Sequence, residues 1–176
     1  MTQSSTATNV GRYRITPGST RSAQAFWRTS HAVAVSMADD VLLNKAAIIE
    51  RCLARIDAEH IGHENELTTN QTRQDAIVLN LLRACEASID LTMHIVRKRR
   101  LGLPQQSREA FEMLQQAGLL SAELSRRMKA MVGFRNIAIR DYPKLNIDTL
   151  HSILDERLDD FRAFTKTLLK ANSGPT

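Results

Sequence analysis

Residues 124–142 read LSRRMKAMVGFRNIAIRDY, and their spacing predicts a helix that ends in a group of polar side chains. One face of this helix holds residues at successive steps of four, three and four, namely Leu124, Met128, Met131 and Arg135. Arg135 therefore shares an apolar stripe, where a guanidinium needs a partner. Tyr142 follows seven residues later on nearly the same face, and Pro143 disfavours helical geometry at that tyrosine. We expect its hydroxyl at an open helix end.

The remaining sequence predicts an all-α protein with one domain. The chain has 176 residues, of which 43% are hydrophobic and only 5% aromatic, a composition that suits a core of packed aliphatic helices. From Met37 onward apolar residues recur at steps of three and four, without the alternation typical of strands. The expected architecture is an up-and-down bundle of four main helices plus a short extra helix.

Local signals set the expected helix boundaries. The first helix is predicted near Asp39 to Asp57, and the second begins at Thr72, as N-cap, and runs to about Arg99. Ser107 is the predicted cap of the short third helix, which Gly118 ends, and Ser121 caps the fourth. The fifth follows Pro143 as one helix, with its apolar seam at Leu150, Leu154, Leu158, Phe161, Thr165 and Leu168.

Most of the net positive charge lies at the start of the chain. Residues 1–36 contain four arginines and no Asp or Glu, which leaves 20 of the 24 cationic residues against all 19 acidic ones. Ser and Thr are frequent in this segment, Pro17-Gly18 interrupts the segment, and its apolar residues show no sustained periodicity. We expect a disordered or loosely attached basic leader over 1–36, a helical domain over 37–171 and a C-terminal tail over 172–176. An upstream-extended start or appended leader is favoured over a mitochondrial transit peptide or a nucleic-acid-binding arm.

The cysteines and histidines indicate neither disulfides nor a metal. Cys52 and Cys85 both fall on apolar stripes, which predicts buried thiols in a reducing compartment, so we expect a cytoplasmic protein. His60, His63 and His151 lack the Cys or carboxylate spacing of a metal site, and no cofactor is expected. No apolar run reaches the length of a membrane span, so no membrane association is expected.

Residues 135–142, Arg-Asn-Ile-Ala-Ile-Arg-Asp-Tyr, resemble the signature of the HepT toxins, a branch of the HEPN superfamily of small all-α ribonucleases. That signature is an Arg, a polar residue (usually Asn), about three spacers, a His, one residue and a Tyr. Arg135, Asn136 and Tyr142 match it, whereas Arg140 stands at the position of the family's His. The resemblance extends over roughly residues 37–170 and includes QDAIVLNL (74–81), Glu86, Ala87, Ile89, Asp90, His94 and LGLPQ (101–105).

The resemblance implies a HEPN-type bundle and a toxin of a type VII toxin–antitoxin system that cleaves RNA without a metal. It implies a homodimer in which two signature segments face one RNA, with Arg135, Asn136 and the residue at position 140 as catalytic residues. Because a guanidinium stays protonated and cannot act as a general base, Arg140 predicts an impaired enzyme. The implied antitoxin is a MntA-like nucleotidyltransferase that transfers AMP to Tyr142.

Several assignments have alternatives. Glu86 and Asp90 lie one turn apart and either support Arg135 through a charge-assisted pair or face solvent. The basic run Arg97, Lys98, Arg99 and Arg100 either contacts RNA or complements the dipole of the helix that it ends. For the whole chain, the alternative is a non-catalytic HEPN helical module for protein interaction or nucleotide binding.

Overall fold

The computed structural model describes the backbone of residues 20–140 and 146–173 and the side chains of residues 40–140 and 146–172. Within these ranges the chain is helical and no residue forms a strand, which confirms the all-α class. The helices are α1 (Thr20–His60), α2 (Gln71–Lys98), α3 (Ser107–Gln116), α4 (Ala122–Arg140), α5 (Ile147–Glu156) and α6 (Leu158–Ser173), with a single 3₁₀ turn, η1 (Glu64–Glu66), before α2. The chain divides into the compact units Met1–Ser36 and Met37–Thr176, and the second contains the core.

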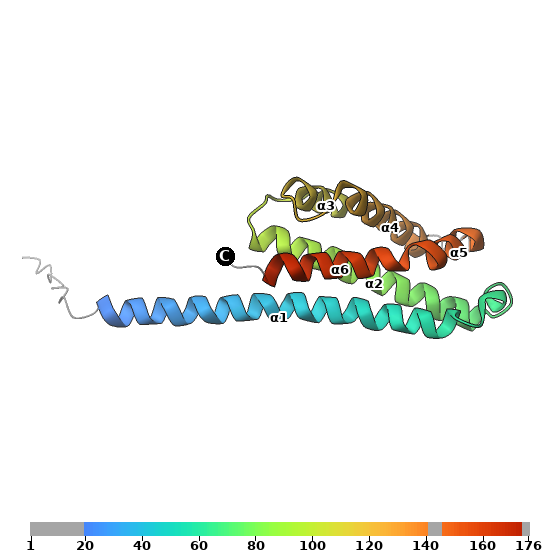
Figure 1. Ribbon diagram of the computed structural model, residues 1–176, viewed down its shortest axis with the longest axis horizontal. Helices are drawn as coiled ribbons and strands as arrows, with labels where there is room; N and C mark the ends of the chain where they lie inside the picture. Colours follow the sequence, from blue (N-terminus) through green and yellow to red (C-terminus); the bar gives the residue numbers. More distant parts are fainter. Residues whose placement is uncertain (1–19, 141–145, 174–176) are drawn as a thin grey trace, which may run out of the picture. The chain divides into compact units, whose positions relative to one another are not determined.

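Helix α2 is the centre of this second unit. It packs against α3, α4 and α6, while α4 also contacts α3 and α6 (Figure 1). The largest buried side chains include Phe111 of α3 and Phe164 of α6, whose ring centroids lie 5.8 Å apart in a tilted arrangement. Aromatic pairs of this geometry stabilise a core beyond their buried area alone. This pair connects α3 to α6.

Helix α1 begins at Thr20, well before the expected start near Asp39, so that expectation was wrong. The segment from Thr20 to His60 contains neither Gly nor Pro, so no residue in it breaks a helix, and Pro17-Gly18 is separated from it only by Ser19. In the second unit, α1 contributes the buried residues Leu42, Ala46, Ile49, Cys52, Leu53 and Ile56.

The single helix expected after Pro143 is in fact two helices. Helix α5 ends at Glu156, Arg157 has φ −114° and ψ −14°, and α6 begins at Leu158. The apolar seam continues across the break because Leu154 and Leu158 bury against the same core. Asp159 and Asp160 lie in the first turn of α6, where acidic residues complement the helix dipole. The periodic seam therefore concealed a helix boundary.

The helix caps agree with expectation in part. Ser121 Oγ accepts the backbone N–H of Leu124 at 3.2 Å, as predicted for the start of α4. Thr72 was the wrong cap for α2, because Asn70 Oδ1 accepts the N–H of Arg73 at 3.1 Å. Ser107 is the first residue of α3 rather than its cap, since the N-cap is Gln106 without a side-chain hydrogen bond. Beyond the end of α3, Gly118 adopts φ +71°.

Candidate functional site

Arg135 is held in place by a carboxylate from another helix. It lies on α4 between the buried Met131 and Ala138, and its Nε donates to Glu86 Oε1 of α2 at 2.6 Å. Nη2 bonds the same oxygen, while Nη1 donates to Asn136 Oδ1 at 3.1 Å. The side chains are 28% and 44% exposed, so the pair contributes little to stability. Its effect is to orient the guanidinium at the surface.

The two carboxylates proposed to support Arg135 have different partners. Glu86 makes the contact with Arg135, but Asp90, one turn further along α2, receives Lys45 Nζ of α1 at 2.6 Å instead. Asp90 therefore connects α2 to α1, and its expected contact with Arg135 was wrong. The catalytic role of Arg135 and the supporting role of Glu86 remain predictions.

The C-terminal turn of α4 presents cations and apolar side chains together. Arg140 is the last residue of the helix, is exposed, and has no hydrogen-bond or ion-pair partner among the residues that the structure describes. Asn136 is also exposed, and Ile137 and Ile139 are 58% and 54% exposed. Because residues two positions apart lie on nearly opposite sides of a helix, these two isoleucines expose apolar area on different faces of α4. Tyr142 belongs to the segment 141–145, which lies outside the described residues.

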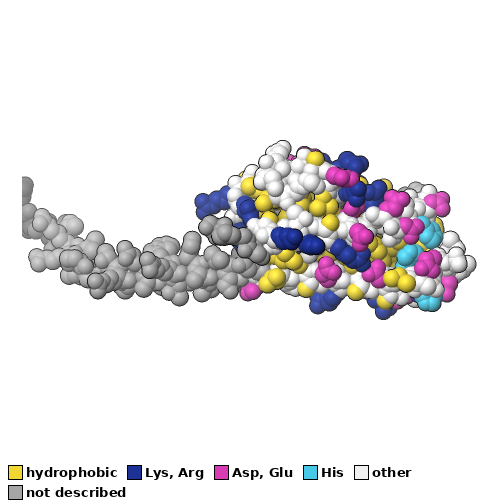
Figure 2. All heavy atoms as spheres, viewed as in Figure 1, with side chains coloured by type: hydrophobic (Ala, Val, Ile, Leu, Met, Phe, Trp, Pro, Cys, Tyr) yellow, Lys and Arg dark blue, Asp and Glu magenta, His cyan; other side chains and the backbone are white. Residues whose placement is uncertain are grey.

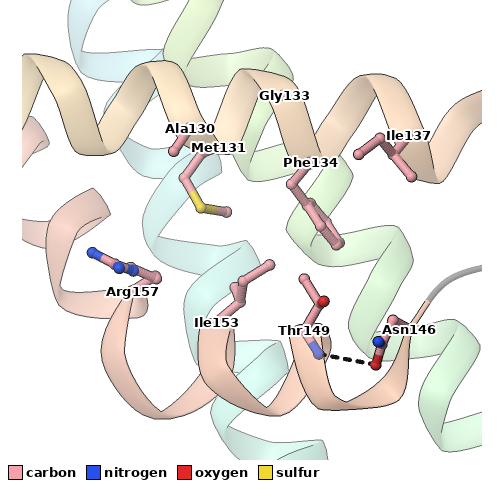
Figure 3. A pocket seen from close by; sticks show the side chains of 9 residues that line it. All are labelled: Ala130, Met131, Gly133, Phe134, Ile137, Asn146, Thr149, Ile153 and Arg157. Carbon is pink, nitrogen blue, oxygen red and sulfur yellow. Dashed lines mark hydrogen bonds between the residues drawn. The ribbon is translucent and has the colours of Figure 1, made fainter.

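A groove of about 450 Å³ adjoins this turn and runs between α4 and α5, from Asn146 to Arg157. Figure 3 shows Met131 and Phe134 projecting from α4 towards Thr149 and Ile153 of α5. Its walls are mainly apolar, with Asn146 and Arg157 among the polar lining residues. The groove therefore continues to the exposed Ile137 on the side of α4 that faces α5, and Arg135, which is directed to Glu86 of α2, is not among its lining residues.

The basic run at the end of α2 is only partly available for a ligand. Lys98 Nζ donates to Asn172 Oδ1 at 2.8 Å, and Arg99 Nη2 donates to the carbonyl of Ala171 at 2.6 Å, so both tie α2 to the end of α6. Arg97 and Arg100 are exposed, and their guanidinium groups have no partner in the described part of the chain. The run begins eleven residues after Glu86, about 16 Å along the helix. A contact between Arg97 or Arg100 and RNA remains a prediction.

Charge on the visible face of the second unit is mixed. Figure 2 shows dark-blue Lys and Arg side chains interspersed with magenta Asp and Glu, not a continuous basic surface. Many charged side chains of this unit form pairs, for example Arg162 with Asp57 at 2.6 Å and Lys129 with Glu112 at 2.8 Å. The binding of an anionic ligand would therefore depend on the Lys and Arg side chains that have no acidic partner.

Both cysteines are buried and free, as predicted. Burial raises the pKa of the Cys85 thiol to about 12 and also raises that of Cys52. Such thiols stay protonated near neutral pH and are poor nucleophiles. They belong to the core and take no part in the site.

No metal site or membrane span is found in the described residues. No three His, Cys, Asp or Glu side chains there are placed to hold a metal ion. His60 and His151 have ring centroids 6.5 Å apart, and His60 Nε2 lies 3.6 Å from Asp155 Oδ1. None of the described helices combines the length and hydropathy that a membrane crossing requires.

Arg108 was not singled out from the sequence although it lies beside the site. It is the second residue of α3, and its Nη2 would be 2.6 Å from a Cβ placed on Gly133 of α4. The available signal was Gly133 itself, because an isolated glycine inside a helical pattern often marks a close approach. Nothing in the sequence specified which residue makes that approach.

Comparison with known proteins shows the family of this chain. The family described as "Ribonuclease HepT-like" matches residues 48–168. The mRNA nuclease HepT of Shewanella oneidensis is 43% identical over 126 residues, which are 72% of this chain and 94% of that protein. A tri-AMPylated HEPN toxin from the same organism, solved in complex with MNT antitoxin, has a TM-score of 0.71 and 42% identity over 75% of this chain and 98% of its own. A toxin–antitoxin structure with AMP-PNP has the same TM-score, identity and coverage.

Proposed function

Because this chain belongs to the HepT-like ribonuclease family of HEPN proteins, we propose that it is the toxin of a type VII toxin–antitoxin pair and acts on RNA. The observation that carries the proposal is the Arg135 guanidinium, which Glu86 and Asn136 hold at the exposed end of α4. The residues of the site are then Arg135, Asn136 and the side chain at position 140. A relative that is an mRNA nuclease supports RNA as the substrate.

The chemistry follows from what RNA cleavage without a metal requires. A base takes the 2′-hydroxyl proton, an acid protonates the leaving oxygen, and positive charge stabilises the phosphorane between them. Arg135 supplies the charge, since its guanidinium stays protonated and presents a planar fork to a phosphate. Arg140 binds a phosphate but cannot exchange a proton near neutral pH, so this chain binds RNA and cleaves it poorly.

A homodimer completes the site in this proposal. One chain offers few groups for acid–base chemistry, whereas a symmetric partner brings a second Arg135 and a second residue 140 to the same cleft. The exposed Ile137 and Ile139 and the adjoining groove supply apolar area for such a contact. The end of α4 is thus both interface and site.

AMP transfer to Tyr142 is the proposed means of inhibition. Tyr142 follows the last residue of α4 by two positions and Arg135 by seven. An adenylyl group there adds negative charge and bulk beside the guanidinium, which blocks RNA. The tri-AMPylated relative and the toxin–antitoxin structure with AMP-PNP support this regulation and a MntA-like nucleotidyltransferase as partner.

Expression in bacteria tests the proposal. Arg140→His should arrest growth when expressed alone, and co-expression of a cognate nucleotidyltransferase should restore it. Mass spectrometry should then show additions in AMP steps on the peptide with Tyr142 and none on Tyr142→Phe. Modification of Tyr13 instead would contradict the assignment of the acceptor.

The second candidate function is a non-catalytic HEPN module for protein interaction or nucleotide binding. The observation in its favour is Arg140, because the signature otherwise has His at that position. Under this alternative, restoring His leaves the chain harmless to the cell. The same expression experiment therefore separates the two functions.

A further inference from the structure

A second cavity of about 450 Å³ lies beside Gly133 between the start of α3 and α4. Its polar lining includes Ser107 and Arg108 of α3 and Asn136 of α4, so it shares Asn136 with the site around Arg135. Asn136 Oδ1 accepts from Arg135, which leaves the amide N–H groups of Asn136 as donors. The pocket thus offers hydrogen-bond donors next to the proposed site.

Arg108 is the positive charge of this pocket. It is exposed and has no hydrogen-bond or ion-pair partner within the described ranges. Its guanidinium lies against Gly133, and a Cβ at that position would be 2.6 Å from Nη2, so the flexible end of Arg108 would have to move away. The nearby carboxylates have other partners: Glu109 accepts the N–H of Gln105 at 2.6 Å, and Glu112 pairs with Lys129. Among the residues that the structure describes, no carboxylate lines the pocket to neutralise Arg108.

We propose that this pocket binds a backbone phosphate of the RNA, with Arg108 as the principal ligand and Asn136 and Ser107 as further donors. Arginine binds phosphate through two parallel N–H donors, and amide and hydroxyl side chains commonly share such contacts. Phosphate contacts fix the register of a strand without reading its sequence. Arg108 is therefore a positioning residue that places the strand along α4 towards Arg135. This inference rests on the proposed action on RNA.

Equilibrium binding of a fluorescent single-stranded RNA tests the pocket, with EDTA present and at several salt concentrations. Arg108→Ala should weaken binding by about tenfold. It should also reduce the magnitude of the slope of log K against log salt by about 0.7, the value for one lost phosphate contact on a single strand. The RNA affinity of Arg108→Lys should lie between those of the parent and Arg108→Ala, because lysine keeps the charge but lacks the planar fork of the guanidinium. Arg51→Ala, an exposed arginine of α1, is the matched control and should bind like the parent.

Gly133→Ala provides an independent variant that keeps every charge. The new methyl group displaces the guanidinium, whereas alanine favours the helix, so binding should weaken while the melting temperature stays equal or rises. The proposed phosphate site would be refuted, and the proposed function left intact, if Arg108→Ala bound RNA with the affinity and salt slope of the parent. Parental affinity in Gly133→Ala would refute the site in the same way. A parent chain that binds no RNA would overturn the proposed function together with the pocket.

Discussion

Glu86 fixes the direction of the Arg135 guanidinium, because one of its oxygens accepts from both Nε and Nη2. In an Arg140→His background, we expect Glu86→Gln to lower the single-turnover rate of RNA cleavage by about tenfold or more, since a weaker acceptor leaves the guanidinium less well placed. RNA affinity should be equal or higher because a negative charge is lost. The free energy of unfolding should change by less than about 1 kcal/mol, as is usual for partly exposed pairs.

The matched control is Asp90→Asn, which makes the same charge change one turn further along α2. Because Asp90 pairs with Lys45 and not with Arg135, the cleavage rate should stay within about twofold of the background, too small a change for a lost catalytic contact. Equal losses of rate in the two variants would show that Glu86 acts only through its charge and would refute the orienting role.

At the residue scale, periodicity predicts that Arg135 needs a partner, and Glu86 and Asp90 of the second helix were two possible partners, with a solvent-facing role as the alternative. It does not choose between them, because the choice depends on Lys45, which comes from a helix distant in sequence. The approach of Arg108 to Gly133 likewise joins two different helices, α3 and α4. Such contacts depend on how helices pack, which the local sequence does not encode.

At the level of elements, the helix caps predict different losses of stability when two serines are replaced. Ser121→Ala should lower the free energy of unfolding by about 1 kcal/mol, because Ser121 Oγ accepts the N–H of Leu124 at the start of α4. Ser107→Ala should be close to neutral, because Ser107 is the first residue of α3 and makes no cap bond. Urea unfolding followed by circular dichroism measures both, and equal effects would contradict the cap assignments.

Helix type was predictable from the sequence, but several boundaries were not. Apolar spacing places α2, α3 and α4 correctly, and Gly118 marks the end of α3. The same spacing runs through Arg157, because α5 and α6 bury one continuous seam, so the break there had no periodic signal. Caps were misassigned where two candidates lie close together, as with Asn70 and Thr72. There the geometry of the preceding turn selects the cap.

At the scale of the whole molecule, the central expectation is a dimer through the end of α4. Light scattering at micromolar concentration should return twice the mass of one chain. Ile137→Asp should yield a monomer, because it introduces a charge into the proposed apolar contact. Leu103→Asp is the control: Leu103 is 84% exposed in the α2–α3 connection and should leave the dimer intact. A parent chain that is monomeric would contradict the proposed assembly.

Deletion of residues 1–36 tests the domain proposal. The described core of α1 begins at Leu42, so a chain starting at Met37 keeps every buried contact that the structure describes. We expect the mean ellipticity per residue of the retained part and the dimer mass to persist after truncation. Loss of cooperative unfolding in the truncated chain would show that the leader is part of the fold.

One comparison tests the central claim, which is that this chain lacks a proton-transfer group beside Arg135 and that a histidine at position 140 would supply it. In the presence of EDTA, Arg140→His should cleave RNA about 10²–10⁴-fold faster than the parent, which is the usual contribution of general acid–base catalysis. Its products should carry a 2′,3′-cyclic phosphate or the hydrolysis product of one. Adding Arg135→Ala should abolish the activity, because the charge that stabilises the transition state is lost. An Arg140→His protein that folds, dimerises and binds RNA, yet cuts several classes of RNA no faster than the parent, would contradict the account.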